Sequence, residues 1–282
     1  MQKISSISEL RETVKHWRKQ GESIAFVPTM GNLHAGHIKL VSEAKNKADR
    51  VVVSVFVNPT QFGEGEDFES YPRTEAEDET KLEAAAADLL FLPAVAEIYP
   101  DNANTVVSVV DLSKRHCGAS RPGHFDGVAT IVTKLFNMVQ PDMAFFGEKD
   151  FQQLMVIKNM VRDLNIPIEI IGVATQRETD GLAMSSRNHY LSDEERAIAP
   201  ALYRSLSKAR ETILSGEMNQ REIERQQQKI LTDLGFKVDY FSICKADDLT
   251  EATDNDTELV ILAAAKLGKP RLIDNTCFSR II

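Results

Sequence analysis

Two histidines three residues apart, His34 and His37, stand at the start of a predicted helix that follows a short apolar run. This spacing places both imidazoles on one face of the helix, pointing back toward its N-terminus. The first turn also leaves backbone N–H groups without partners and carries a partial positive charge, which suits phosphate oxygens. Gly36 between them lets a bulky group approach the backbone. The pattern predicts a site for an anionic phosphorus centre, with helix capping or plain surface exposure as the alternative.

A metal site is a weaker interpretation of the same pair. Zinc-binding helices place their histidines at i and i+4 with a glutamate between them, and this helix does not. The cysteines that would add ligands, Cys117, Cys244 and Cys277, are far apart in the sequence. Their odd number argues against a disulfide framework and favours a reducing compartment. We therefore assign no metal ligand.

Polar residues follow two other predicted elements. Asn58 and Gln61 come after a buried strand, where amides suit a ligand that carries a hydroxyl and a carboxylate. A simple Asn-Pro turn is the alternative. Arg121 and His124 flank a Pro-Gly turn, and both side chains suit an anion.

Residues 147–150 form a second junction between a strand and a helix. Lys149 can place its charge on phosphate oxygens, and Asp150 can hold a ribose hydroxyl or a metal. An exposed charged turn is the alternative here. The polar stretch 177–188 lacks apolar periodicity, so it is either a mobile loop that closes over a triphosphate or an ordinary interdomain linker.

The elements that position these residues alternate between strand and helix. Apolar runs predict buried strands over residues 24–27, 51–57, 88–92, 143–146 and 168–173, with a further extended segment over 105–110. Helical periodicity covers residues 4–20, 34–44, 73–87 and 128–139, and another helix contains Gln153. This alternation predicts an α/β fold with a Rossmann-like, doubly wound parallel sheet and right-handed βαβ units.

The pattern changes after Ser192, which forms a capping box with Glu195. We expect a helix from there to about residue 214, a second helix over about 219–234, and short antiparallel strands over 238–243, 258–264 and 271–273. The predicted domains are a Rossmann-like ligand-binding domain over 1–175, a linker with a mobile loop over 176–190, and a smaller α+β lid domain over 191–282.

The composition is that of an ordinary globular protein, with 43% hydrophobic and 27% charged residues among 282. The 33 basic and 42 acidic residues give a net charge of -9, which argues against a nucleic-acid partner. No signal peptide or long apolar segment is recognisable, so we expect no membrane partner and a cytoplasmic location.

Eight segments, in order and over nearly the whole chain, resemble the pantoate–β-alanine ligase (pantothenate synthetase) family. They are VPTMGNLHAGH, FVNPTQF, YPRT, RPGHFDGV, KLFN, GEKDFQQL, DGLAMSSRN and RLIDN. HAGH and MSSR are also similar to the His-Ile-Gly-His and Lys-Met-Ser-Lys-Ser signatures of the nucleotidyltransferase superfamily, which includes class I aminoacyl-tRNA synthetases. The resemblance implies ATP-dependent condensation of (R)-pantoate with β-alanine through a pantoyl adenylate, giving pantothenate, AMP and pyrophosphate. It further implies Mg²⁺ and a homodimer held mainly by the N-terminal domain.

The resemblance also implies roles for individual residues. The nucleotide would be bound by Met30, Gly31, Asn32, Leu33, His34, Ala35, Gly36, His37, Gly147, Glu148, Lys149, Asp150, Gln176, Met184, Ser185, Ser186 and Arg187. Catalytic roles fall to His37 as proton donor, His34, Lys149, Ser185 and Arg187. Pantoate would meet Gln61 and Gln153, with Gln61 also reaching β-alanine and with Asn58, Arg121 and His124 as further substrate contacts. We expect the imidazoles, the lysine and the serine-arginine loop to converge on one triphosphate.

The chain departs from the family pattern at two places. Residues 114–118 read KRHCG where the family carries a Leu-Glu-Gly type segment, and Gln176 stands where the family tends to have valine. Two rival functions also remain. One is a related nucleotidyltransferase that adenylates another small acid, and the other is a non-catalytic nucleotide-binding homologue.

Overall fold

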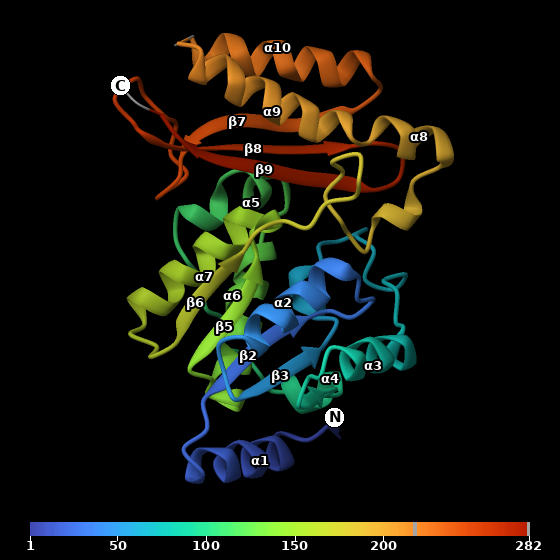
Figure 1. Ribbon diagram of the computed structural model, residues 1–282, viewed down its shortest axis with the longest axis vertical. Helices are drawn as coiled ribbons and strands as arrows, with labels where there is room; N and C mark the ends of the chain where they lie inside the picture. Colours follow the sequence, from blue (N-terminus) through green and yellow to red (C-terminus); the bar gives the residue numbers. More distant parts are fainter. Residues whose placement is uncertain (217–218, 281–282) are drawn as a thin grey trace. The chain divides into compact units, whose positions relative to one another are not determined.

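The computed structural model describes residues 1–216 and 219–280, which form two compact units (Figure 1). The first unit contains residues 1–148 and 156–174, and the second contains residues 149–155 and 175–282. Each unit is built around a sheet of its own. In the described part of the chain, no helix has the length and apolar character needed to span a membrane.

Six strands, each parallel to its neighbours, form the sheet of the first unit in the order β1-β4-β3-β2-β5-β6. They are β1 (Gln2–Ile4), β2 (Ile24–Thr29), β3 (Arg50–Val55), β4 (Leu89–Phe91), β5 (Met143–Gly147) and β6 (Glu169–Val173). The strand order reverses at β2, because β3 and β4 lie on one side of it and β5 and β6 on the other. The predicted doubly wound parallel sheet is confirmed. Its switch point lies between β2 and β5, where such sheets bind ligands.

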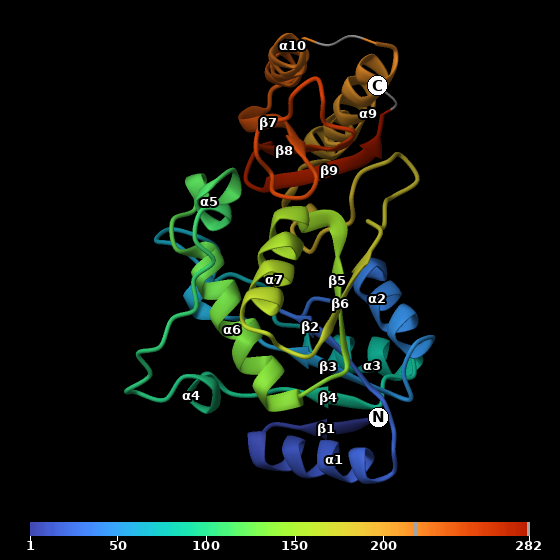
Figure 2. The same cartoon turned by 90° about the vertical axis from the view of Figure 1, so that its left-hand side faces the viewer.

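Helices cover both faces of this sheet (Figure 2). On one face, Leu40, Val41 and Ala44 of α2 pack against buried valines of β2 and β3. On the other face lies α6, which also contacts α1. The helices are α1 (Ile7–Lys19), α2 (Ala35–Lys45), α3 (Glu75–Ala84), α4 (Val95–Ile98), α5 (Cys117–Ser120), α6 (His124–Val139) and α7 (Phe151–Asp163), whose first residues belong to the second unit.

Strand β2 shows how the sequence produces both the sheet and its switch point. Residues 24–27 are apolar and fully buried, as a strand covered on both faces requires. The strand continues through Pro28 to Thr29 beside β3, whereas the sequence predicted its end at the proline. Pairing with β5 covers only Ala25 and Phe26, so the missing N–H group of Pro28 interrupts no ladder on that side. Beyond Phe26 the ladder between β2 and β5 has ended.

The second unit packs helices on an antiparallel sheet in the order β7-β8-β9. Helices α9 and α10 contact one another and this sheet, burying Leu206, Ile213, Ile223 and Leu231 in a common core. The elements are α8 (Asp193–Ile198), α9 (Ala201–Leu214), α10 (Gln220–Asp233), β7 (Lys237–Lys245), β8 (Glu258–Lys266) and β9 (Arg271–Ser279). The antiparallel pairing is as predicted, but β9 runs six residues beyond its predicted end at residue 273, because polar residues 274–276 hide the apolar alternation.

One further prediction was wrong. The single helix expected over 192–214 is two helices, since Pro200 at the start of α9 cannot donate an N–H bond to the turn before it. The Ser192–Glu195 capping box at the start of α8 is confirmed. Residues 105–110, predicted as an extended segment, belong to neither sheet, and the N–H group of Val107 donates to Thr130 Oγ1 of α6 at 2.9 Å.

Candidate active site

The two histidines at the start of α2 cap the helix with their own side chains. His34 is the N-cap, and its Nδ1 accepts a hydrogen bond from the backbone N–H group of Gly36 at 3.1 Å. His37 reaches back, and its Nδ1 accepts from the N–H group of His34 at 3.3 Å. The ring centroids are 4.1 Å apart. The capping alternative is therefore what the structure shows for both Nδ1 atoms.

Capping by Nδ1 also fixes where the proton of each ring lies. A backbone N–H group can only donate, so Nδ1 of His34 and Nδ1 of His37 must both be acceptors. In a neutral imidazole the proton is then on Nε2, the atom on the far side of the ring. Each ring thus carries an N–H donor that the cap does not use. The cap and a phosphate site are compatible with one another, and the cap orients the donors.

The turn before this helix is held by a buried carboxylate that the sequence did not single out. Asp78 of α3 is 1% exposed, and it accepts hydrogen bonds from the N–H groups of Asn32 at 2.8 Å and Leu33 at 2.7 Å. Lys81 of the same helix donates to the carbonyl of Leu33 at 2.8 Å. Gly31 has a φ of +82°, and a side chain there would press against Asp78. Helix α3 therefore determines the backbone path of the predicted ATP-binding turn.

Asn58 and Gln61, after β3, form a tightly supported corner. Asn58 is 1% exposed; its amide donates to Gln61 Oε1 at 3.0 Å and to the carbonyl of Gly127 at 3.2 Å. Its oxygen accepts from the hydroxyl of Tyr99 at 2.9 Å. Gln61 Nε2 approaches the sulfur of Met30 at 3.3 Å. Asn58 thus orients the Gln61 side chain, and both predicted substrate residues belong to one hydrogen-bonded group.

Arg121 and His124 also belong to this corner. Arg121 makes a two-pronged ion pair with Glu66, at 2.7 and 2.6 Å, and its Nη1 lies 2.9 Å from His124 Nε2. Burial raises the pKa of the Glu66 carboxyl, but the hydrogen bonds and charge of Arg121 outweigh it and lower the pKa to about 2. The sequence analysis assigned the positive charge of Arg121 to a bound anion. In the structure, the carboxylate of Glu66 balances that charge.

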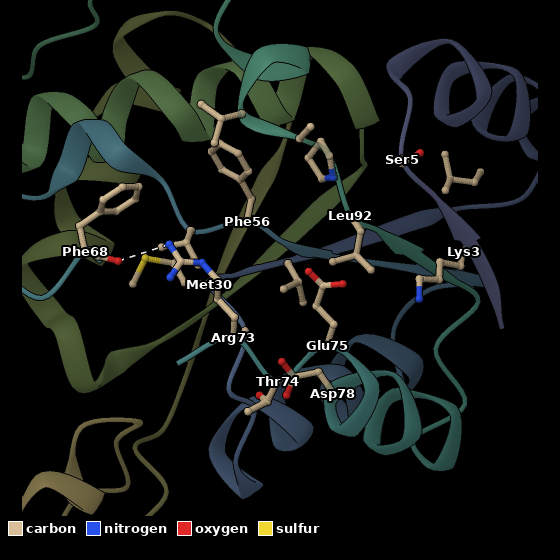
Figure 3. Close-up of a pocket in the computed structure, with 17 residues that line it drawn as sticks. Lys3, Ser5, Met30, Phe56, Phe68, Arg73, Thr74, Glu75, Asp78 and Leu92 are labelled. Carbon is tan, nitrogen blue, oxygen red and sulfur yellow. Dashed lines mark hydrogen bonds between the residues drawn. The ribbon is translucent and has the colours of Figure 1, made fainter. Parts of the chain in front are cut away.

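A cavity of about 420 Å³ is lined in part by the turn that is predicted to bind ATP (Figure 3). Its wall includes Met30, Gly31 and Asp78, but neither His34 nor His37. The remaining residues lining it are Lys3, Ile4, Ser5, Val55, Phe56, Val57, Phe68, Arg73, Thr74, Glu75, Leu92, Pro93, Ala94 and Val95. This cavity is therefore distinct from the predicted phosphate site, although the turn at Met30 and Gly31 lines the cavity and leads into that site.

In the second unit, Lys149 and Asp150 stand at the start of α7. Asp150 Oδ1 accepts from the N–H group of Gln153 at 3.1 Å, which caps the first turn of the helix. Asn275 of β9 is 7% exposed and donates from Nδ2 to the carbonyl of Lys149 at 3.0 Å. Asn275 was missed as a supporting residue, although it lies in the RLIDN segment that carried part of the resemblance.

The serine-arginine segment is also anchored to β9. Arg177 forms a two-pronged ion pair with Asp274, at 2.6 and 3.0 Å, and its guanidinium stacks 3.6 Å from the ring centroid of Tyr203. The carbonyl of Gln176 accepts from the N–H group of Met184 at 2.9 Å, so the departure to glutamine leaves this backbone contact in place.

A small cavity within the second unit brings two predicted catalytic residues together, since Lys149 and Ser185 both line it. Ser185 Oγ accepts from the N–H group of Arg187 at 3.2 Å, and the carbonyl of Ser185 accepts from the N–H group of Asn188 at 3.0 Å. The segment is thus folded on itself as a compact turn. Ser186 and Gln176 do not line this cavity.

Comparison with known families gives a match over residues 2–277 to the model described as pantoate-beta-alanine ligase. The chain belongs to the pantoate–β-alanine ligase family. The resemblance found in the sequence is confirmed. The predicted fold class and the prediction that the chain is an enzyme are confirmed as well.

Relatives of known name match end to end. The pantothenate synthetase of Alteromonas mediterranea is 56% identical over 282 residues, covering 99% of this chain and all of the relative. That of Shewanella loihica is 57% identical with the same coverage. The crystal structure of pantothenate synthetase from Thermus thermophilus superposes with a TM-score of 0.93 at 46% identity, covering 98% of this chain and 99% of the other.

A ligand-bound member of the pantoate–β-alanine ligase family is also similar. The Francisella tularensis enzyme, in complex with beta-gamma ATP and beta-alanine, has a TM-score of 0.81 and 35% identity, covering 98% of this chain and 97% of the other. Packing accounts for the glycine within the divergent segment 114–118. Gly118 of α5 lies against the carbonyl of Ser113, where a Cβ would be only 1.9 Å from the oxygen, so glycine is required. Cys117 beside it is buried.

Proposed function

We propose that this chain uses ATP to condense (R)-pantoate with β-alanine, giving pantothenate, AMP and pyrophosphate. One observation carries the proposal most directly. The imidazole cap of α2, with its Nε2–H donors, follows β2, and Gly147–Glu148 follows β5, so the two segments leave neighbouring strands at the switch point. Membership of the pantoate–β-alanine ligase family supplies the substrates.

In the first step, a carboxylate oxygen of pantoate attacks the α-phosphorus of ATP, and pyrophosphate leaves. Negative charge grows on the phosphate oxygens, so the protein must position the reacting groups and neutralise that charge. The Nε2–H groups of His34 and His37 donate to those oxygens, beside the positive end of α2. Lys149, Ser185 and Arg187 serve the phosphates as well, and Asp150 binds the ribose.

In the second step, the amine of β-alanine attacks the acyl carbon of pantoyl adenylate. The new C–N bond forms as the bond to the phosphate oxygen breaks; AMP leaves, and the amine loses a proton. Water would hydrolyse the adenylate, so exclusion of water is required. We assign that task to residues 184–187. Gln61 and Gln153 hold pantoate, with Gln61 also reaching β-alanine.

Mg²⁺ enters in this proposal as part of the substrate, bound to ATP. Among the described residues, no group of three or more His, Cys, Asp or Glu side chains gathers in a way that could hold an ion. In nucleotide-dependent enzymes Mg²⁺ keeps several waters and binds chiefly through substrate phosphates. We also propose a cytoplasmic location, where the three cysteines, free of disulfides in the structure, would stay reduced.

The test of the proposed reaction is ATP–pyrophosphate exchange with pantoate in the absence of β-alanine. Exchange that requires pantoate supports the adenylate route, and β-alanine should then convert the intermediate into pantothenate. Exchange with a different small acid would favour the related nucleotidyltransferase. ATP binding without exchange would favour a non-catalytic homologue.

We propose a homodimer that uses the first unit. Val106 and Val110 are 68% and 67% exposed, in a β-prone segment that belongs to no strand. A second copy of this chain would cover both valines. Replacing both with glutamate should shift the mass from dimer to monomer in light scattering, whereas a dimer that survives the double substitution places the contact elsewhere.

A further inference from the structure

Glu66 belongs to an acidic loop on the first unit that carries no assigned role in the reaction. Its neighbours Glu64 and Glu69 are exposed, but Glu66 is partly buried and its carboxylate meets the guanidinium of Arg121 with both oxygens. Two parallel N–H···O bonds of this kind fix the planes of both groups. The pair therefore restrains Arg121 in one orientation, with neither partner more than 25% exposed.

The orientation of Arg121 decides the tautomer of His124. Arg121 Nη1 can only donate, so His124 Nε2, 2.9 Å away, accepts and carries no proton. The proton of the neutral ring is then on Nδ1, which lies 2.7 Å from the carbonyl oxygen of Gln61 and donates to it. His124 is 6% exposed, so this bond is shielded from water. A chain of hydrogen bonds runs from Glu66 to the backbone of Gln61.

Gly127, on the same helix α6 as His124, adds a second contact with the backbone at Gln61. A Cβ at Gly127 would lie 2.3 Å from the carbonyl oxygen of Thr60 and 2.7 Å from the nitrogen of Gln61, so the helix touches this backbone directly. With its backbone held by both contacts with α6, Gln61 projects its amide between Asn58 and the Met30 sulfur. Movement of the carbonyl would therefore turn the side chain that we assign to pantoate.

We propose that Glu66 is a positioning residue for the pantoate site, acting through Arg121 and His124 on Gln61. The inference rests on the proposed function, because it needs Gln61 to bind pantoate. In this arrangement Arg121 is a brace and not the ligand of the substrate carboxylate. The two roles predict opposite effects when Glu66 loses its charge.

The experiment measures KM for pantoate, KM for ATP and kcat in Glu66→Gln, with Glu64→Gln as the control. Both variants make the same charge change in the same loop. We expect Glu66→Gln to raise KM for pantoate about tenfold, as for loss of a charged hydrogen bond, with KM for ATP within about twofold of wild type. Arg121→Lys, which keeps the charge but cannot span Glu66 and His124 together, should do the same. Glu64→Gln should match wild type.

A lower KM for pantoate in Glu66→Gln would mean that Arg121, once released, binds the substrate carboxylate itself, and would overturn the inference. Equal effects of Glu66→Gln and Glu64→Gln would overturn it too, since they would report only net charge. The melting temperature of each variant separates a general loss of folding from the KM effect. Wild-type protein without pantoate-dependent exchange would remove the proposed function instead.

Discussion

The start of α2 and the start of α6 both present histidines beside a glycine, yet their imidazoles are bonded in opposite senses. His34 and His37 accept through Nδ1 and keep a proton on Nε2. His124 accepts through Nε2 and donates through Nδ1 to the carbonyl of Gln61. In the first arrangement the Nε2 atoms take no part in the cap. In the second, His124 uses both ring nitrogens to connect Arg121 with the backbone of Gln61. Two sequence motifs that look equally suited to anions are thus bonded differently: one caps a helix, and the other connects Arg121 to the backbone of Gln61.

The largest effect that would sharpen this contrast is expected at His37. His37→Ala removes the donor that we assign to the phosphate oxygens and should slow pantoate-dependent pyrophosphate exchange by about 100-fold or more. The control is His16→Ala on α1, where the side chain is exposed. Exchange at a near-normal rate in the His37 variant would show that this imidazole is only a cap.

Variants of His124 should differ in KM for pantoate according to whether they keep the hydrogen bond to Gln61. His124→Leu removes the shorter of two hydrogen bonds to the carbonyl of Gln61, at 2.7 Å against 3.4 Å from Arg121 Nη2, and should raise KM for pantoate about tenfold. His124→Asn keeps an amide nitrogen near the position of Nδ1 and should stay within about threefold of wild type, because that one hydrogen bond survives. If both variants lose activity equally, His124 contacts the substrate itself and the contrast between the two regions fails.

His34→Asn tests whether capping and binding can be separated at α2. Asparagine is a favourable N-cap, so the free energy of unfolding should change by less than about 0.5 kcal/mol. The Nε2–H donor is lost, and KM for ATP should rise about fivefold, the cost of one modest hydrogen bond. Urea unfolding and steady-state kinetics on the same preparation give both numbers. A normal KM for ATP would assign His34 to the helix alone.

The smallest effect concerns acid. The pKa of Glu66 is lowered from 4.5 to about 2, so its pair with Arg121 stabilises the folded state above the unfolded pKa of 4.5 and is lost as the pH falls through 2. Glu66→Gln should therefore flatten the decline of unfolding free energy between pH 4.5 and 2. An unchanged acid profile would show that the pair does not stabilise the fold.

Much of the fold could be predicted from local pattern, because the strands of the first unit are uninterrupted apolar runs. Residues 24–27 and 51–53 are wholly buried, and few other structures suit such segments. The break in the helix after Ser192 was also readable in principle, since Pro200 stands in the sequence. The end of β9 was not, because Asp274 and Asn275 are buried polar residues that make contacts outside their own strand.

The supporting residues of the site escaped prediction for a physical reason. Asp78 looks like any of the acidic residues around it in α3, and its importance comes from N–H groups 45 and 46 positions away. Glu66 likewise sits among similar acids, and Arg121 lies 55 positions from it. Sequence pattern identifies residues whose chemistry is unusual, such as a pair of histidines. It cannot single out a common carboxylate whose role depends on where the chain folds.

The imidazole cap of α2 makes the helix start sensitive to acid in a way that can be followed without any substrate. A ring that gains a proton on Nδ1 can no longer accept, so the amides of Gly36 and His34 are released to solvent. Their hydrogen exchange should quicken as the rings become charged, while amides deeper in the helix stay protected. The backbone amide signals of Gly36 and His34 would then report whether the two imidazoles are charged or neutral when the protein binds a nucleotide.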